Sequence, residues 1–156
     1  MNFLQKIESK NTPKAIGPYS PAVKLGDFVY LSGQLGMNVD GELVSEDVVE
    51  QTHQAMKNMG SLLAEMGLSY RHVVKTTVFV KDLNDFAKVN EVYGSYFNEG
   101  TYPARSCVEV ARLPKDAKVE IECMALDTLA YERQMAAHQC GGCHGSCDDE
   151  CCGGCE

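Results

Sequence analysis

The length and composition of the chain suit one modest globular domain followed by a tail. Its 156 residues carry a formal net charge of −8, and residues 138–156 supply half of that charge, with four acidic side chains and no Lys or Arg. Neither part has the clustered Lys and Arg of a nucleic-acid binder, and no apolar run is long enough for a membrane span. The first ten residues mix charges among apolar side chains, unlike a secretory signal. We therefore expect a cytoplasmic protein without membrane or nucleic-acid partners.

The first half of the chain predicts a hairpin and then a helix. Two short strands, 22–25 and 28–34, flank Gly26-Asp27, which suits a tight turn. A helix should begin near Ser45 or Asp47, with Glu50 placed as in a capping box, and Gly67 should end it. Its apolar stripe predicts packing against a sheet, and it consists of Thr52, Ala55, Met56, Met59, Leu62, Leu63 and Met66.

The next segment predicts a central strand and a second helix. Residues 73–80 are rich in β-branched side chains and apolar on both faces, as in a strand covered on two sides. Asp82 is placed as the N-cap of the second helix, and Gly100 should end it. Asn90 lies on the apolar stripe of that helix, which consists of Phe86, Val89, Tyr93 and Phe97.

Residues 102–126 predict two strands that carry charged and thiol side chains among apolar ones. Side chains alternate from Ala104 onward and again over 119–126, which indicates an antiparallel hairpin. A register with residue 110 opposite residue 119 would bring four functional side chains onto one face: Arg105, Cys107, Glu120 and Glu122. Such a face suits a small anionic substrate, because Arg grips a carboxylate with two hydrogen bonds and Glu can move a proton. The alternative is a cross-strand salt bridge between Arg105 and one of the two glutamates.

The order of these elements predicts an α+β fold. Two helices would pack on one face of a mixed sheet. Because two helices cover only one face, we expect self-association to cover the other.

Four segments of the sequence resemble the RidA/YjgF family of reactive imine/enamine deaminases. The resemblance runs from about residue 7 to residue 125, and its Pro-Ala-Arg-Ser-Cys-Val-Glu-Val-Ala form is similar to the RidA subgroup. The four segments occur in the family's order and are residues 15–20 (AIGPYS), 31–34 (LSGQ), 74–83 (VKTTVFVKDL) and 103–114 (PARSCVEVARLP). The resemblance implies a chorismate-mutase-like fold assembled as a homotrimer, with its sites between subunits.

The resemblance also implies roles for individual residues. Arg105 matches the anchor of the substrate carboxylate, the backbone at Cys107 matches a position that holds the substrate nitrogen and a water, and Glu120 matches the acid that activates this water. Tyr19 matches a tyrosine that closes the pocket. The remaining lining positions are Ser32, Gly33 and Asn90. From the residues alone Glu122 is as good an acid as Glu120, and only the family pattern favours Glu120.

The reaction implied is that of a 2-iminobutanoate/2-iminopropanoate deaminase. It hydrolyses 2-aminoacrylate or its homologue, released by pyridoxal-phosphate dehydratases, to a 2-keto acid and ammonia, without a metal or organic cofactor. The partners are small 2-imino or 2-enamino acids and further copies of the chain. Alternatives are a nucleophilic Cys107 thiol activated by Arg105, a non-catalytic ligand-binding or chaperone-like trimer, and RNA cleavage, against which the acidic charge argues.

The C-terminal sequence departs from the family pattern. We expect a deaminase domain over 1–130 and an extension over 131–156, which opens with a short helix over 131–137 and continues as a Cys-rich tail. Its thiols could bind Zn²⁺ or Cu⁺, and they are Cys140, Cys143, Cys147, Cys151, Cys152 and Cys155. Disulfides, or a flexible tail without a specific ligand, are the alternatives.

Overall fold

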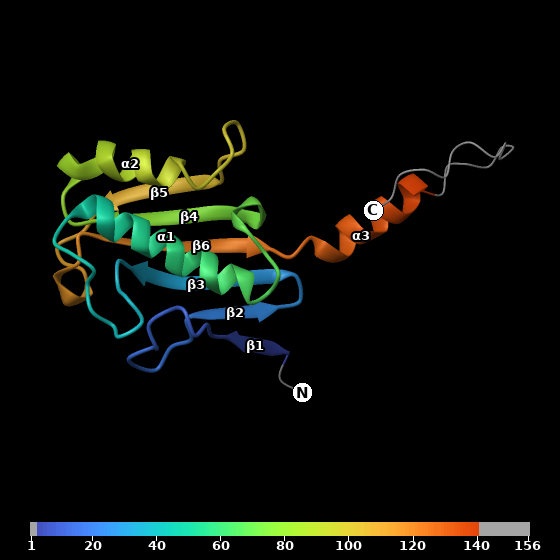
Figure 1. Ribbon diagram of the computed structural model, residues 1–156, viewed down its shortest axis with the longest axis horizontal. Helices are drawn as coiled ribbons and strands as arrows, with labels where there is room; N and C mark the ends of the chain where they lie inside the picture. Colours follow the sequence, from blue (N-terminus) through green and yellow to red (C-terminus); the bar gives the residue numbers. More distant parts are fainter. Residues whose placement is uncertain (1–2, 141–156) are drawn as a thin grey trace, which may run out of the picture.

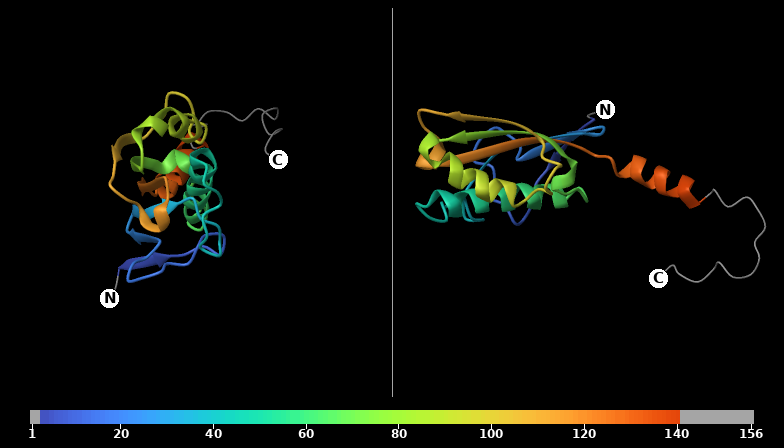
Figure 2. Two further views of the ribbon diagram at one scale, coloured as in Figure 1. Left: turned by 90° about the vertical axis from the view of Figure 1, so that its left-hand side faces the viewer. Right: turned by 90° about the horizontal axis from the view of Figure 1, so that it is seen from above.

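The computed structural model describes residues 3–140 and has a six-stranded mixed sheet with two helices on one face (Figure 1). Its strands are ordered β1-β2-β3-β6-β4-β5. They are β1 (Leu4–Ile7), β2 (Ala22–Leu25), β3 (Phe28–Leu35), β4 (Val73–Val80), β5 (Ala104–Glu109) and β6 (Val119–Leu126), and the helices are α1 (Val48–Ala64), α2 (Phe86–Gly94) and α3 (Leu129–Cys140). This confirms the predicted α+β class and places α1 and α2 together on one side of the sheet (Figure 2).

The predicted N-terminal hairpin is present as β2 and β3. They pair antiparallel around Gly26, whose φ of +59° suits a residue without a side chain. Strand β1 was not predicted, because its four residues, LQKI, are too short and too polar to give a pattern. It adds to β2 with Leu4 opposite Leu25.

Helix α1 begins where the sequence predicts. The Asp47 carboxylate accepts hydrogen bonds from the backbone N–H groups of Val49 and Glu50 at 2.8 and 3.1 Å. The Asp47 N–H, which a capping box would give to the Glu50 side chain, donates instead to the Ser45 hydroxyl at 2.9 Å. The Met-rich stripe packs on the sheet as expected, and Met56, Met59, Leu62 and Leu63 are fully buried.

Helix α2 is shorter than predicted. Asp82 caps a 3-10 turn over Leu83–Asp85, which leads into α2. The helix ends at Gly94 rather than near Gly100, because the Ser95 hydroxyl donates to the Val92 carbonyl at 2.7 Å and the chain then turns its aromatic side chains back onto the core.

The predicted hairpin between the last two strands is wrong. Strand β5 pairs parallel with β4, and β6 pairs antiparallel with both β3 and β4, so that β4 separates β5 from β6. The physical reason is that α2 is the crossover of a β4–α2–β5 unit, which favours parallel pairing. The connection over 110–118 is long enough to carry the chain across β4 to the start of β6.

The face of the sheet opposite α1 and α2 exposes apolar side chains. The side chains of residues that pair directly across strands lie on the same face of the sheet. In each strand, the alternate residues that the helices do not bury therefore have their side chains on this open face. Five of its apolar side chains are 43–53% exposed: Leu4, Leu25, Phe28, Tyr30 and Val108. Leu4, Leu25 and Phe28 are direct cross-strand neighbours, and an exposed apolar patch of this kind is typical of an interaction site.

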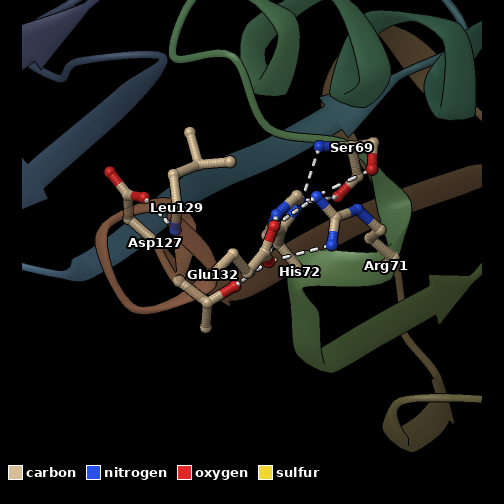
Figure 3. A network of polar contacts seen from close by, with 7 residues as sticks. Ser69, Arg71, His72, Asp127, Leu129 and Glu132 are labelled. Atoms are coloured by element: carbon tan, nitrogen blue, oxygen red, sulfur yellow. Dashed lines mark hydrogen bonds and ion pairs between the residues drawn. The ribbon is translucent and has the colours of Figure 1, made fainter. Parts of the chain in front are cut away.

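The first turn of α3 is tied to the domain by a polar network, while the rest of the helix projects away from it (Figures 1 and 3). Both Arg71 terminal nitrogens donate to the Glu132 carboxylate at 2.8 Å, and the Thr128 hydroxyl donates to it at 2.6 Å. The buried His72 Nε2 lies 3.5 Å from the same carboxylate. The predicted helix at 131–137 is therefore present and one turn is anchored.

Candidate functional site

A cavity of about 480 Å³ brings together four of the predicted site residues: Tyr19, Ser32, Gly33 and Glu120. Its wall also includes Ile16, Leu35, Met37 and Pro114, which make it largely apolar. A few polar groups in an apolar hollow of this size are typical of a small-molecule site.

The loop and strand around Gly33 explain how these residues meet. The pairing of β3 with β6 is interrupted between Leu31 and Gln34, so Ser32 and Gly33 form an irregular step in the strand. The Ser32 hydroxyl donates to the Ser20 carbonyl at 2.7 Å, which holds the Tyr19 loop beside the step. A Cβ on Gly33 would lie 1.8 Å from Glu120 Oε1. The carboxylate therefore occupies the space that any larger residue at 33 would fill.

The environment of Glu120 favours a carboxyl that can exchange protons. Burial raises the pKa of the Glu120 carboxyl, and the negative charge of Glu122 raises it further. Glu122 lines a neighbouring hollow with Lys75 and Thr77 instead of the cavity. The geometry therefore distinguishes the two glutamates, which the residues alone could not do.

The second group of predicted residues lies under α2. Arg105 Nη1 donates to Asn90 Oδ1 at 2.6 Å, and its guanidinium stacks over Tyr93 with 4.8 Å from Cζ to the ring centroid. The same guanidinium lies over the Phe86 ring, with 5.6 Å from Cζ to the ring centroid. Within residues 3–140 no carboxylate pairs with Arg105, so the cross-strand salt bridge considered from the sequence is excluded. Its remaining N–H donors can serve an anionic ligand.

Cys107 shares the face of Arg105 and packs against the main core. Burial raises the pKa of its thiol, although the Arg105 charge lowers it in part. A thiol of this kind stays protonated near neutral pH and is a weak nucleophile.

The two groups do not meet within one chain. Arg105 lies opposite Thr76, which points to the helices, whereas Glu120 lies opposite Phe79, which points to the open face. The predicted common face for the arginine, the thiol and the two glutamates is therefore wrong. With β4 between them, β5 and β6 are also about 10 Å apart within the sheet. Strand β5 is an edge strand of the sheet, so its outer backbone groups have no strand partner within residues 3–140.

Lys115 is a cavity residue that the sequence did not indicate. Its backbone is left-handed, with φ of +56°, and its Nζ donates to the Gly41 carbonyl at 2.5 Å while the residue lines the cavity. A left-handed lysine has no signature in sequence, so the residues alone could not indicate it.

The predicted metal site lies in the tail and outside the described residues, apart from Cys140 at the end of α3. Among residues 3–140, no group of three or more His, Cys, Asp or Glu side chains is arranged to hold a metal ion. No helix in that range is long and apolar enough to cross a membrane. The cytoplasmic location and the division at residue 130 stay predictions.

Comparison with known proteins establishes the family. A family model described as endoribonuclease L-PSP matches residues 9–127. The chain belongs to this family. The RidA/YjgF resemblance inferred from the sequence is thereby confirmed.

Three relatives show how near the similarity is. The 2-iminobutanoate/2-iminopropanoate deaminase of Salmonella typhimurium is 52% identical over 122 residues, which cover 77% of this chain and 95% of that one. The solved YjgF gene product of E. coli is 50% identical with a TM-score of 0.74, covering 78% and 98% of the two chains. E. coli TdcF with bound serine is 47% identical with the same TM-score and coverage. The family model ends at residue 127, before the Cys-rich tail.

Proposed function

We propose that the chain is a 2-iminobutanoate/2-iminopropanoate deaminase whose site is completed by a second copy of the chain. The observation that carries the proposal is the separation of two half-sites, Arg105 with Asn90 on the helix face and Glu120 with Gly33 on the open face. The name of the Salmonella relative supports the reaction and the substrates.

A homotrimer suits this arrangement. The open face carries exposed apolar side chains that another copy would bury, and β5 lies at an edge where a neighbouring chain can approach. A closed ring of three copies makes three equal interfaces, each joining the Arg105 half of one copy to the Glu120 half of the next. Every site would then contain both groups.

The chemistry follows from what each half-site offers. One N–H of Arg105 donates to Asn90, and its other N–H groups bind the substrate carboxylate through two parallel hydrogen bonds. Glu120 takes a proton from a water whose oxygen bonds to the electrophilic carbon of the protonated imine, and the C=N electron pair moves to nitrogen. Glu120 returns this proton to the nitrogen of the resulting carbinolamine. It then accepts the hydroxyl proton as the C–N bond breaks, so that ammonia leaves and the C=O of the 2-keto acid forms. Orientation supplies most of the acceleration, so the proposed reaction uses no cofactor.

The Cys107 thiol has no covalent role in this scheme. Its raised pKa and its packing against the core disfavour attack by sulfur. The substrate would instead meet backbone groups of the edge strand, which a Cys107→Ser substitution preserves.

The deciding experiment measures 2-keto acid and ammonia release from 2-iminobutanoate generated in situ by a threonine dehydratase, compared with uncatalysed hydrolysis. Glu120→Gln should lower turnover on the order of 10²–10⁴-fold, because the amide keeps the shape and loses the base. Gly33→Ala should have a similar effect by displacing the carboxylate, whereas Gly94→Ala, whose Cβ would meet nothing nearer than 4.0 Å, should not. Tight binding of the substrate without any release would instead favour the non-catalytic alternative, and RNA cleavage that Glu120→Gln leaves intact would reject this site.

A further inference from the structure

Strands β3 and β6 separate beside the cavity. Their ladder ends where Leu35 lies opposite Glu120, and the chain then turns away so that Met37 bridges to Leu43. Leu35, Met37 and Glu120 all line the cavity, so the fork between the two strands is part of its wall. Such a fork leaves backbone groups of both strands without ladder partners in the interior, where each needs a hydrogen bond.

The side-chain amides of two buried residues of α1 form hydrogen bonds with such backbone groups from the other side of the sheet. Asn58, 1% exposed, donates to the carbonyls of Leu35 and Met37 at 3.1 and 2.9 Å. Gln51, 0% exposed, accepts from the Lys118 N–H at 2.8 Å and donates to the Ser45 carbonyl at 2.8 Å. The two amides thus hold different arms of the fork, because only Gln51 bonds to the chain that leads into β6.

The Gln51 contact lies just beyond the end of the ladder. Continuing the register by two residues would set Met37 opposite Lys118, but β3 has already turned away there. The Lys118 carbonyl accepts from the Lys81 N–H at 2.9 Å on the β4 side, and Gln51 Oε1 accepts the Lys118 N–H. The strand also rests directly on the helix at this point, since a Cβ on Gly36 would lie 2.5 Å from Gln51 Cα. Gln51 is therefore fixed against β3 and bonded to the start of β6.

We infer that Gln51 is a positioning residue for Glu120. It makes no contact with the cavity itself, but it fixes the backbone two residues before Glu120 and so keeps the carboxylate seated against Gly33. This inference rests on the proposed function for its catalytic consequence, and on the hydrogen bonds for its structural one.

The test compares three variants of the full chain. Gln51→Met keeps the side-chain volume and removes both hydrogen bonds. Gln51→Glu keeps an oxygen that accepts from the Lys118 N–H and, as the protonated acid expected at a fully buried position, a donor for the Ser45 carbonyl, so it serves as the conservative rescue. Thr52→Val is the matched control, because Thr52 is equally buried in the same turn and its hydroxyl bonds only within α1, to the Val48 carbonyl at 2.6 Å.

Gln51→Met should lower kcat on the order of 10- to 100-fold with little change in KM, since small misplacement of a catalytic group costs this much. The acid limb of the kcat–pH profile of this variant should move to lower pH. The reason is that the loosened Glu120 carboxylate becomes more hydrated, so its pKa falls back toward the ordinary value of a glutamate. Gln51→Glu should recover most of kcat at neutral pH. Thr52→Val should lower the melting temperature and leave kcat and the acid limb unchanged.

A second readout does not depend on turnover. NMR titration of the Glu120 carboxyl should show a lower pKa in Gln51→Met than in Thr52→Val or the unaltered chain. The other titratable or charged groups that face the cavity, Lys14, Tyr19 and Lys115, are the same in all three, as is Glu122. If the unaltered chain has no turnover, the proposed function fails while this titration still decides the inference. Equal Glu120 titrations in Gln51→Met and Thr52→Val would overturn it, whatever the activity.

Discussion

The contact between Gly33 and Glu120 shows how one small residue can govern the placement of a proposed catalytic group. The carboxylate fills the volume that a side chain at 33 would need, and the interrupted ladder beside it leaves room for a cavity. Arg105 is held in a comparable way, by Asn90 at its edge and by Tyr93 on its face. Each half-site is thus shaped before any substrate arrives, which is what catalysis through orientation requires.

Arg105 is expected to tolerate neither Lys nor Ala. An ammonium cannot form the two parallel bonds to a carboxylate, bond to Asn90 and stack as a plane on Tyr93 at once. We expect kcat/KM for 2-iminobutanoate to fall on the order of 10²-fold or more in both variants. Arg112→Lys is the matched control, because Arg112 pairs with Asp116 in the exposed turn. Near-normal turnover in the Arg105→Lys variant would remove Arg105 from the role of anchor.

The pH dependence of the reaction should follow the Glu120 carboxyl. Its raised pKa means that the basic form is lost as the pH falls through a value above that of an ordinary glutamate. Glu122→Gln removes a neighbouring negative charge, so the Glu120 pKa should fall and the acid limb of kcat/KM should move to lower pH. An acid limb that does not respond to this change would show that another group carries the proton.

At the scale of elements, side-chain patterns located the strands and helices but not all of their partners. The alternation over 104–110 and 119–126 identified which residues of each strand share a face. It could not tell an adjacent antiparallel strand from a parallel one reached across α2, and the assumption of a hairpin put Arg105 and Glu120 on one face. The cap at Asp47 and the Met-rich stripe were predictable because both depend on local spacing.

The anchor of α3 gives a prediction at this scale. The ion pair with Arg71 and the Thr128 hydroxyl lower the pKa of Glu132 to about 2, so the anchor should persist above this value and weaken as the pH falls through it. Arg71→Ala should increase hydrogen exchange of the α3 amides at neutral pH without changing deaminase activity. Arg133→Ala on α3 itself is the control. Unchanged exchange in Arg71→Ala would mean that the Leu129 contact with the core alone holds the helix.

At the scale of the whole molecule, we expect the fold and the extension to have separate tasks. The family match ends at residue 127, and α3 begins two residues later. The candidate site residues all precede that point. Composition could predict the extension and its thiols, and the coverage of only one sheet face by helices predicted self-association. The surface that a second copy would contact can be proposed only once the strands are paired.

The tail is expected to bind a soft metal independently of the site. Six Cys and two His occur within residues 138–156, and thiolates favour Zn²⁺ or Cu⁺. A chain ending at Ala137 should lose the metal measured by elemental analysis under reducing conditions and keep full turnover. Equal metal in both forms, or none in either, would reject the tail as a metal site.

Mixing two inactive variants tests the shared site most directly. Arg105→Ala and Glu120→Gln each remove one half-site, and a trimer formed from both contains some interfaces with an intact Arg105 from one copy and an intact Glu120 from its neighbour. Refolding the two together in equal amounts should restore roughly a quarter of the normal turnover of 2-iminobutanoate, the random share of such interfaces in a symmetric ring. A mixture that stays as inactive as either variant alone, although light scattering shows mixed trimers, would contradict a site built from two copies.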